Sequence, residues 1–253
     1  MTLVNFVAEA QSTADRWFNE PIQSIPVKTL GPFSATADGA CQVALPDGAI
    51  AFVKPRPDAP RNLVVAREKI ASDLAHILEL PVAPVVVRVP IPDQGWPHHS
   101  ALSLSCLKAG RLWAAGGDVH RVTAGQALEA LRIFWTWIGD DDYNAHGQNL
   151  LFEVQTGAVA VAAIDHSFSL CHRNATNPLA VGECKGYGTK DEFRPTAQLS
   201  MVKIRSLEWA RIEPIVRRMH PILTGQEQER ILQILKERRD HLVRLLGLEE
   251  QKS

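Results

Sequence analysis

Two neighbouring stretches near the middle of the chain carry the strongest signal for the fold: WIGDDDYNAHGQNLLF (residues 137–152) and AVAAIDHSFSL (residues 160–170). Apolar runs follow Asn149 and precede Asp165, so the pattern predicts two strands joined by a turn. Asn149 then lies at the start of the first strand and Asp165 at the end of the second, which brings both side chains to one cleft. Amide and carboxylate oxygens are ligands that Mg²⁺ accepts in proteins.

A second hairpin is predicted closer to the N-terminus. The strand-like runs CQVAL and AIAFVK flank a Pro-Asp-Gly turn at residues 46–48, whose residues pre-set φ or accept positive φ. The second run ends in Lys54. The segment that follows, residues 63–80, has apolar side chains near helical spacing and carries Glu68. A lysine at a strand end is therefore followed by a glutamate on a helix.

The remaining patterned segments predict a small sheet in the first half and helices in the second. Residues 20–33 contain three prolines and indicate an extended lead-in, and further strands are expected over residues 84–91 and 101–107. Helices are expected over residues 123–139, 206–219 and 224–247. The first is expected to have Thr123 as its N-cap and to end at Gly139, the second is interrupted by Pro214, and the third is opened by a Thr224 and Glu227 capping box. We therefore expect a β-rich domain over residues 1–108 and a mainly helical domain over residues 109–253.

The order of the polar residues suggests phosphoryl transfer. That chemistry needs a cation on the nucleotide phosphates, an acidic residue that fixes the cation, oxygen ligands for magnesium and a group that orients the acceptor hydroxyl. Lys54 fits the role of the cation on the phosphates, and Glu68 fits that of the acidic residue that fixes it. Asn149 and Asp165 fit the role of magnesium ligands. The region around Asn144 is left for the fourth.

The sequence resembles the HipA-like kinases of the wider protein-kinase-like group, from about residue 34 to residue 170. The residues AREKIASDLAHILELPVAP are similar to that family's glutamate helix, NAHGQNLLF to its catalytic loop and AIDHSFSL to its magnesium strand. The resemblance implies an α+β, two-lobed protein-kinase-like fold that uses ATP and Mg²⁺. It also implies that Lys54 and Glu68 form the ion pair that spans the lobes, and that Asn149 and Asp165 hold magnesium.

The same resemblance assigns further residues around the nucleotide. The stretch SATADGAC, with Ser34, Thr36 and Gly39, occupies the place of the loop that covers the phosphates, and Gly39 is its one glycine. The stretch LSCLKAG, with Cys106 and Leu107, occupies the place of the hinge that meets adenine. We expect these residues to bind nucleotide.

The catalytic loop departs from the family pattern at one position. Asn144 stands five residues before Asn149, where the family has a catalytic aspartate, and an amide cannot take a proton at neutral pH. Three explanations stay open: an inactivated variant of an active kinase, a pseudokinase, or a shifted loop in which Asp142 does the work. His146 either contacts phosphate or substrate or packs within the loop, and His166 either packs or orders its neighbours. The run of three aspartates from Asp140 is expected to be a solvated acidic loop start.

Composition limits the class of protein. The chain has 253 residues, 45% of them hydrophobic, and a formal net charge of -1, so it can bury a full core and lacks the excess positive charge of proteins that coat nucleic acid or anionic membranes. It has no signal peptide pattern and its four cysteines are widely spaced, which indicates a cytoplasmic protein with reduced thiols.

These observations favour a Ser/Thr protein kinase, of a toxin type in one reading, with a protein substrate and an antitoxin or other regulatory protein as partners. A small-molecule or lipid kinase and a nucleotide-binding pseudokinase that acts as an interaction module are the alternatives. Neither nucleic acid nor a membrane is expected as a direct partner.

Overall fold

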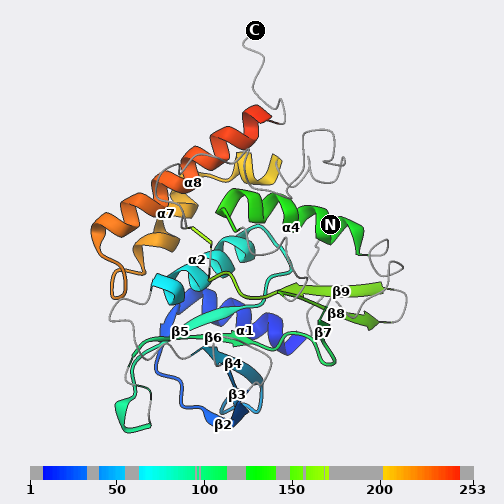
Figure 1. The fold of residues 1–253 in the computed structure, drawn as a ribbon, viewed down its shortest axis with the longest axis vertical. Helices are drawn as coiled ribbons and strands as arrows, with labels where there is room; N and C mark the ends of the chain where they lie inside the picture. Colours follow the sequence, from blue (N-terminus) through cyan, green and yellow to red (C-terminus); the bar gives the residue numbers. More distant parts are fainter. Residues whose placement is uncertain are drawn as a thin grey trace.

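The computed structural model describes residues 8–32, 40–54, 63–94, 96, 98–112, 124–140, 149–155, 158–167, 169–170 and 202–245. The helices are α1 (Ala8–Asn19), α2 (Leu63–Ile77), α4 (Gly125–Ile138), α7 (Trp209–Arg217) and α8 (Gly225–Leu245), with a short 3-10 helix η1 (Pro92–Gln94). The strands are β1 (Ile22–Gln23), β2 (Lys28–Pro32), β3 (Cys41–Ala44), β4 (Ile50–Lys54), β5 (Val85–Arg88), β6 (Ser100–Leu104), β7 (Arg111–Leu112), β8 (Leu150–Gln155) and β9 (Ala158–Ala163). In Figure 1 the six-stranded sheet lies toward the bottom of the molecule and helices α4, α7 and α8 lie toward the top.

The sheets have the connectivity of hairpins rather than of a parallel α/β fold. The larger sheet has the order β1-β5-β6-β4-β3-β2, in which only the β1 and β5 pair is parallel. A separate three-stranded sheet has the order β7-β8-β9 and is antiparallel throughout. The predicted α+β class, with a small β-rich lobe and a mainly helical lobe, is confirmed. The boundary between the lobes at residue 108 stays a prediction.

Both predicted hairpins are present. In the first, β3 pairs with β4, and Gly48 in the turn has φ of 83°, a value that glycine adopts at little cost. Asp47 accepts a hydrogen bond from the Ala49 amide at 3.0 Å, the local contact that makes aspartate a turn residue. In the second hairpin β8 pairs with β9 in unbroken register from Leu150 opposite Ala163 to Gln155 opposite Ala158. Lys54 is thus the last residue of β4, and Asp165 lies two residues beyond β9.

No element was predicted before residue 20, and the structure adds a helix there. Residues 8–19 form α1, whose buried side chains Ala10, Ala14 and Trp17 recur at helical spacing. Two of the three are alanines, which carry too little hydrophobic contrast to be seen as a stripe in the sequence. The proline-containing stretch after it is extended as expected, and it supplies β1 and β2 to the sheet.

Pro214 does not interrupt its helix, contrary to the prediction. α7 runs through it from Trp209 to Arg217, and the break instead lies at residues 207–208, between a helical turn over residues 202–206 and α7. Pro214 is the sixth of the nine residues of α7 and has no N–H, so the helix continues with one intrahelical hydrogen bond fewer. The Thr224 and Glu227 capping box at the start of α8 is confirmed, with Glu227 accepting from the Thr224 amide at 2.7 Å.

α4 connects the helical lobe to the predicted catalytic loop. Its last two turns are buried, with Phe134, Trp137 and Ile138 fully enclosed. Gly139 ends the helix in the left-handed conformation at φ of 67°, as predicted, and a Cβ at this position would collide with the Arg238 guanidinium. The predicted cap Thr123 lies outside the described residues, and Ala124 occupies the N-cap position.

A buried ionic network joins α1, α2 and α7. Lys69 donates to the Trp17 carbonyl at 2.9 Å and to Asp73 at 2.6 Å, and both Lys69 and Asp73 are buried. Arg218 donates to the Phe18 carbonyl at 2.7 Å and to the second oxygen of Asp73 at 3.2 Å. Two cations therefore satisfy carbonyls at the C-terminal end of α1, where such groups lack partners within the helix. The network fixes α2 against both lobes.

Within the described ranges, no helix is long and apolar enough to cross a membrane.

Candidate active site

The candidate site begins with an ion pair between the sheet and α2. Lys54 at the end of β4 donates from Nζ to Glu68 Oε1 at 2.8 Å. The side chain of Glu68 is only 4% exposed, so its carboxylate needs compensation by charge or by hydrogen bonds. Lys54 provides the first, and the backbone N–H of His166 donates to Glu68 Oε2 at 2.9 Å. Both oxygens of this glutamate are therefore occupied.

Asp165 completes a three-residue charge cluster. Its Oδ1 lies 2.5 Å from Lys54 Nζ and accepts from the Ser167 hydroxyl at 2.7 Å. The backbone of Asp165 has φ of 62°, a left-handed conformation that aspartate tolerates better than most residues because its side chain can bond locally. Such conformations cluster at functional sites, where the surrounding structure enforces them.

The charges in this cluster are mutually dependent. Burial opposes the charge on Lys54, but the carboxylates of Glu68 and Asp165 outweigh it, so the pKa of Lys54 lies above its ordinary value. Burial also opposes the charge on Asp165, yet Lys54 and the Ser167 hydroxyl lower the pKa of Asp165 to about 2. Burial raises the pKa of Glu68, and the strongest opposing influence is again Lys54. Lys54 and Asp165 are both ionised at neutral pH.

Asn149 lies beside Asp165 through the backbone. The Ile164 amide donates to the Asn149 carbonyl at 2.8 Å, so the residue before β8 faces the residue that leads into Asp165. Asn149 is half-buried. The hairpin β8 and β9 thus brings together the backbones at two residues that stand sixteen positions apart in the sequence and that both have oxygen-bearing side chains.

These two residues fit a magnesium ion that is shared with a nucleotide. Asp165 uses Oδ1 for both Lys54 and Ser167, so Oδ2 is not used by either contact. Within the described residues, no group of three or more His, Cys, Asp or Glu side chains could hold a metal ion by itself. Mg²⁺ in phosphoryl-transfer sites takes one or two protein ligands and completes its shell with water and phosphate oxygens. One carboxylate and one amide match that requirement.

Cys106 and Leu107 follow β6 at the connection between the two sheets. Both are buried, in the apolar cluster that also contains Val53 of β4 and Ala162 of β9. Burial raises the pKa of the Cys106 thiol to about 12, so this cysteine is an inert packing residue. The segment therefore joins the lobes through an apolar contact.

Several predicted site residues lie outside the described residues. They are Ser34, Thr36 and Gly39 of the predicted phosphate-covering loop, and Asp142, Asn144 and His146 of the predicted catalytic loop. Of the remaining candidates, the structure brings Lys54, Glu68 and Asp165 into direct contact.

Two residues that sequence reasoning undervalued belong to the surroundings of this cluster. Asp140 was expected to be part of a solvated acidic loop start, but it is fully buried and its Oδ2 lies 3.0 Å from His166 Nδ1. His166 is buried as well, and its ring meets Phe134 edge to face. His166 therefore packs within the lobe and also makes a polar contact, while its predicted role in ordering its neighbours stays a prediction. One feature of the sequence indicated this burial: Asp140 directly follows Gly139, the residue that ends a buried helix.

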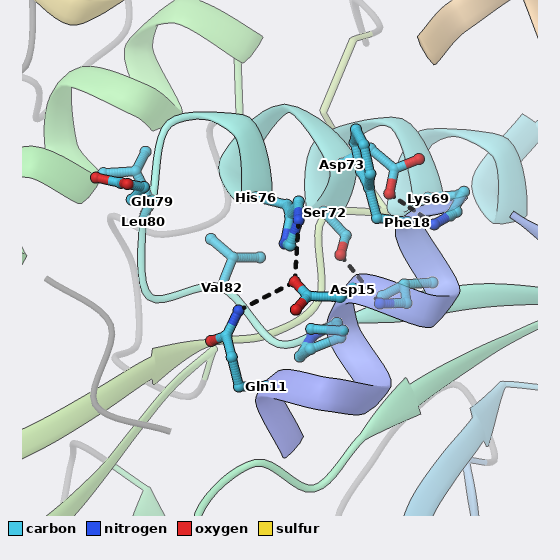
Figure 2. A pocket seen from close by; sticks show the side chains of 13 residues that line it. Gln11, Asp15, Phe18, Lys69, Ser72, Asp73, His76, Glu79, Leu80 and Val82 are labelled. Atoms are coloured by element: carbon cyan, nitrogen blue, oxygen red, sulfur yellow. Dashed lines mark hydrogen bonds and ion pairs between the residues drawn. The ribbon is translucent and has the colours of Figure 1, made fainter. Parts of the chain in front are cut away.

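A cavity of about 280 Å³ lies elsewhere, between α1, α2 and the start of β5. Figure 2 shows Asp15 of α1 pointing toward His76 of α2, a contact of 3.5 Å, with Gln11 on its other side. Lys54, Glu68, Asn149 and Asp165 are not among the residues that line it. The cavity is therefore separate from the candidate active site.

Comparison with known proteins supports the fold. No protein-family model matches the sequence, and no curated protein matches it. Among solved structures, the chain is similar to the Helicobacter pylori proinflammatory kinase CtkA, with a TM-score of 0.65, 10% identity and coverage of 90% of this chain and 96% of that one. It is also similar to the Golgi casein kinase, with a TM-score of 0.52, 12% identity and coverage of 99% and 78%.

A second structure of the Golgi casein kinase, with Mn and ADP bound, has a TM-score of 0.50, 12% identity and coverage of 95% of this chain and 77% of that one. At these identities the similarity establishes a protein-kinase-like fold. The more specific resemblance to HipA-like kinases stays a prediction.

Proposed function

We propose that this protein binds ATP with Mg²⁺ between its two lobes and is built for phosphoryl transfer to a hydroxyl group. The observation that carries the proposal is the position of Lys54 Nζ, which contacts Glu68 at 2.8 Å and Asp165 at 2.5 Å. A sheet lysine, a helix glutamate and a carboxylate after a β-hairpin converge here on a protein-kinase-like fold. In kinases this arrangement serves to hold phosphates and metal together.

Each residue has a distinct role in this proposal. Lys54 moves from Asp165 to the nucleotide phosphates, while Glu68 keeps its ammonium in place. Asp165 and Asn149 hold the magnesium ion, which supplies neutralisation of the phosphate charge. The segment that contains Cys106 and Leu107 is proposed as the hinge beside the adenine, with both side chains buried in the apolar cluster. The phosphate-covering loop with Ser34, Thr36 and Gly39 is proposed to close over the nucleotide.

The hydroxyl acceptor is proposed to be a Ser or Thr side chain of a protein, following the resemblance to HipA-like kinases. Asn144 stands in the place of the residue that orients and deprotonates that hydroxyl. We propose that this protein, with asparagine at position 144, is an inactivated form of such a kinase, because the residues proposed to hold nucleotide and metal are intact.

Asn144 also favours a second candidate function, a pseudokinase that binds nucleotide and acts as an interaction module. A transfer assay with labelled ATP separates the two. Aspartate is nearly isosteric with asparagine, and general-base catalysis contributes ~10²- to 10⁴-fold, so Asn144→Asp should raise autophosphorylation or ATP consumption well above background.

Each outcome of this assay supports one reading. If the parent protein already transfers phosphate from ATP and Asp142→Asn abolishes this activity, Asp142 is the catalytic carboxylate. If both the parent and Asn144→Asp bind ATP and stay inert, the pseudokinase function holds and the kinase function does not.

A further inference from the structure

A buried polar pair lies next to the candidate active site and has no part in the roles proposed above. His166 Nδ1 and Asp140 Oδ2 are 3.0 Å apart, and their side chains are 1% and 0% exposed. A fully buried carboxylate is costly unless a partner compensates it, so the pair constrains both side chains strongly. Phe134 packs edge to face on the imidazole, with 6.1 Å between ring centroids, and limits its rotation further.

The pair is anchored on the helical lobe. Asp140 follows the left-handed Gly139, and its own amide donates to the Trp135 carbonyl at 2.9 Å. It therefore extends directly from the buried end of α4. On the other side of the pair, the Leu170 amide donates to the Ile138 carbonyl at 2.8 Å, so the segment after His166 also lies against α4. The position of Asp140 is thus set by the core of the lobe.

From His166 the contacts continue into the charge cluster. The backbone N–H of His166 donates to Glu68 Oε2 at 2.9 Å, and the other oxygen of Glu68 accepts from Lys54. Lys54 in turn contacts Asp165, the residue immediately before His166. The ring of His166 thus faces Asp140 while its amide faces Glu68. Asp140 and Phe134 restrict the ring, and the backbone at His166 carries both this ring and the amide that donates to Glu68.

We propose that Asp140 and His166 are positioning residues of the active site. Asp140 holds the imidazole, the imidazole fixes the backbone at His166, and this backbone places Glu68 and Asp165 at the separation that Lys54 and a magnesium nucleotide require. The relay joins the start of the catalytic loop to α2, so it couples the helical lobe to the glutamate of the small lobe. This inference rests on the proposed function for its consequence, but its geometry exists without a nucleotide.

The test compares a substitution that keeps a donor toward Asp140 and loses the ring with one that keeps a ring and loses the donor. In His166→Asn the side-chain amide nitrogen stands as many bonds from Cα as Nδ1 does, so it can still donate to Asp140. In His166→Phe a ring is kept, and the buried Asp140 loses its hydrogen bond to residue 166. Trp137→Phe is the matched control, because it removes another buried hydrogen bond of α4, from Trp137 Nε1 to the Leu235 carbonyl at 2.9 Å, away from the charge cluster.

Two measurements are made on each folded variant. The first is amide hydrogen exchange of residue 166 and of α2 in the nucleotide-free protein. The second is the affinity for ADP with Mg²⁺ by calorimetry. We expect His166→Phe to exchange faster at residue 166 and to bind Mg·ADP at least about tenfold more weakly, as the loss of a buried charge-assisted bond implies. His166→Asn should keep most of the exchange protection and most of the affinity for Mg·ADP. Trp137→Phe should keep the protection and the affinity of the parent while its free energy of unfolding is lower.

The inference is overturned if His166→Phe keeps the parent protection at residue 166 and in α2, or if His166→Asn fails as completely as His166→Phe. The two proposals fail in different ways. A parent protein that binds no Mg·ADP removes the proposed function, whereas the exchange data alone still decide whether Asp140 and His166 position Glu68.

Discussion

Lys54 is the residue whose removal tests the charge cluster most severely. Lys54→Met keeps the length of the side chain and removes the ammonium that Glu68 and Asp165 share. The pKa of Asp165 falls from an ordinary 3.8 to about 2, which corresponds to about 2 kcal/mol of stabilisation at about 1.4 kcal/mol per pKa unit. Glu68 would also remain as a buried carboxylate without its cation. We therefore expect the free energy of unfolding to fall by about 2–4 kcal/mol at pH 7.

The same substitution should strengthen the dependence of stability on pH between pH 5 and pH 7. In the parent protein the pKa of Asp165 is lowered by folding, so its contribution is present above about pH 4 and is lost as the pH falls toward 2. In Lys54→Met two carboxylates face each other without a cation, which raises the pKa of at least one of them above its unfolded value. The folded state then binds more protons than the unfolded state, and the variant gains stability between pH 7 and pH 5.

Urea denaturation of the parent and the variant at pH 5, 6 and 7 measures both effects. Lys203→Met is the matched control, since Lys203 pairs with Glu79 at 3.1 Å with both side chains about half exposed, and it should cost less than about 0.5 kcal/mol. If Lys54→Met has the stability and the pH profile of the control, the electrostatic account of the cluster is refuted.

Two further predictions concern the surroundings of the site. Arg218→Met removes the hydrogen bonds to Asp73 and to the Phe18 carbonyl. Because Asp73 is buried, the free energy of unfolding should fall by about 2–4 kcal/mol in a denaturation experiment. A decrease below about 0.5 kcal/mol would show that the network does not fix α2. Cys106 is buried with its thiol pKa raised to about 12, so in the native protein a thiol reagent at pH 8 should label the half-buried Cys41 before Cys106, as mass spectrometry of the digested protein would reveal. Labelling of Cys106 at the rate found in denatured protein would contradict its placement.

Much of the fold could be predicted from the sequence because its signals are local. Turn residues at 46–48 and the apolar runs that flank them define a hairpin within fourteen residues. Gly139 indicates the end of α4 because glycine readily adopts the left-handed conformation found there. α1 was missed because its buried stripe consists largely of alanines, and its place is decided by contacts with α2 and α7 that are distant in sequence.

The residues of the candidate site also differ in how far the sequence reveals them. Lys54, Glu68 and Asp165 could be selected because their order along the chain, each at the end of or within a recognisable element, matches a known arrangement. The pair of Asp140 and His166 could not, because the two residues are 26 positions apart and only the packing of α4 against the segment after β9 brings them together. In the sequence Asp140 is one of three adjacent aspartates, and only burial distinguishes it from a solvated charge.

The central claim is that Asp165 helps to hold magnesium for a bound nucleotide. The most direct measurement is the thermal stability of the parent and of Asp165→Asn with ATP, in the presence and absence of Mg²⁺. Asparagine tolerates the left-handed backbone at φ of 62° and has the same shape, so the variant isolates the charge. We predict that ATP raises the melting temperature of the parent only with Mg²⁺ and that Asp165→Asn loses this magnesium-dependent rise. An equal magnesium-dependent rise in both proteins would contradict the account.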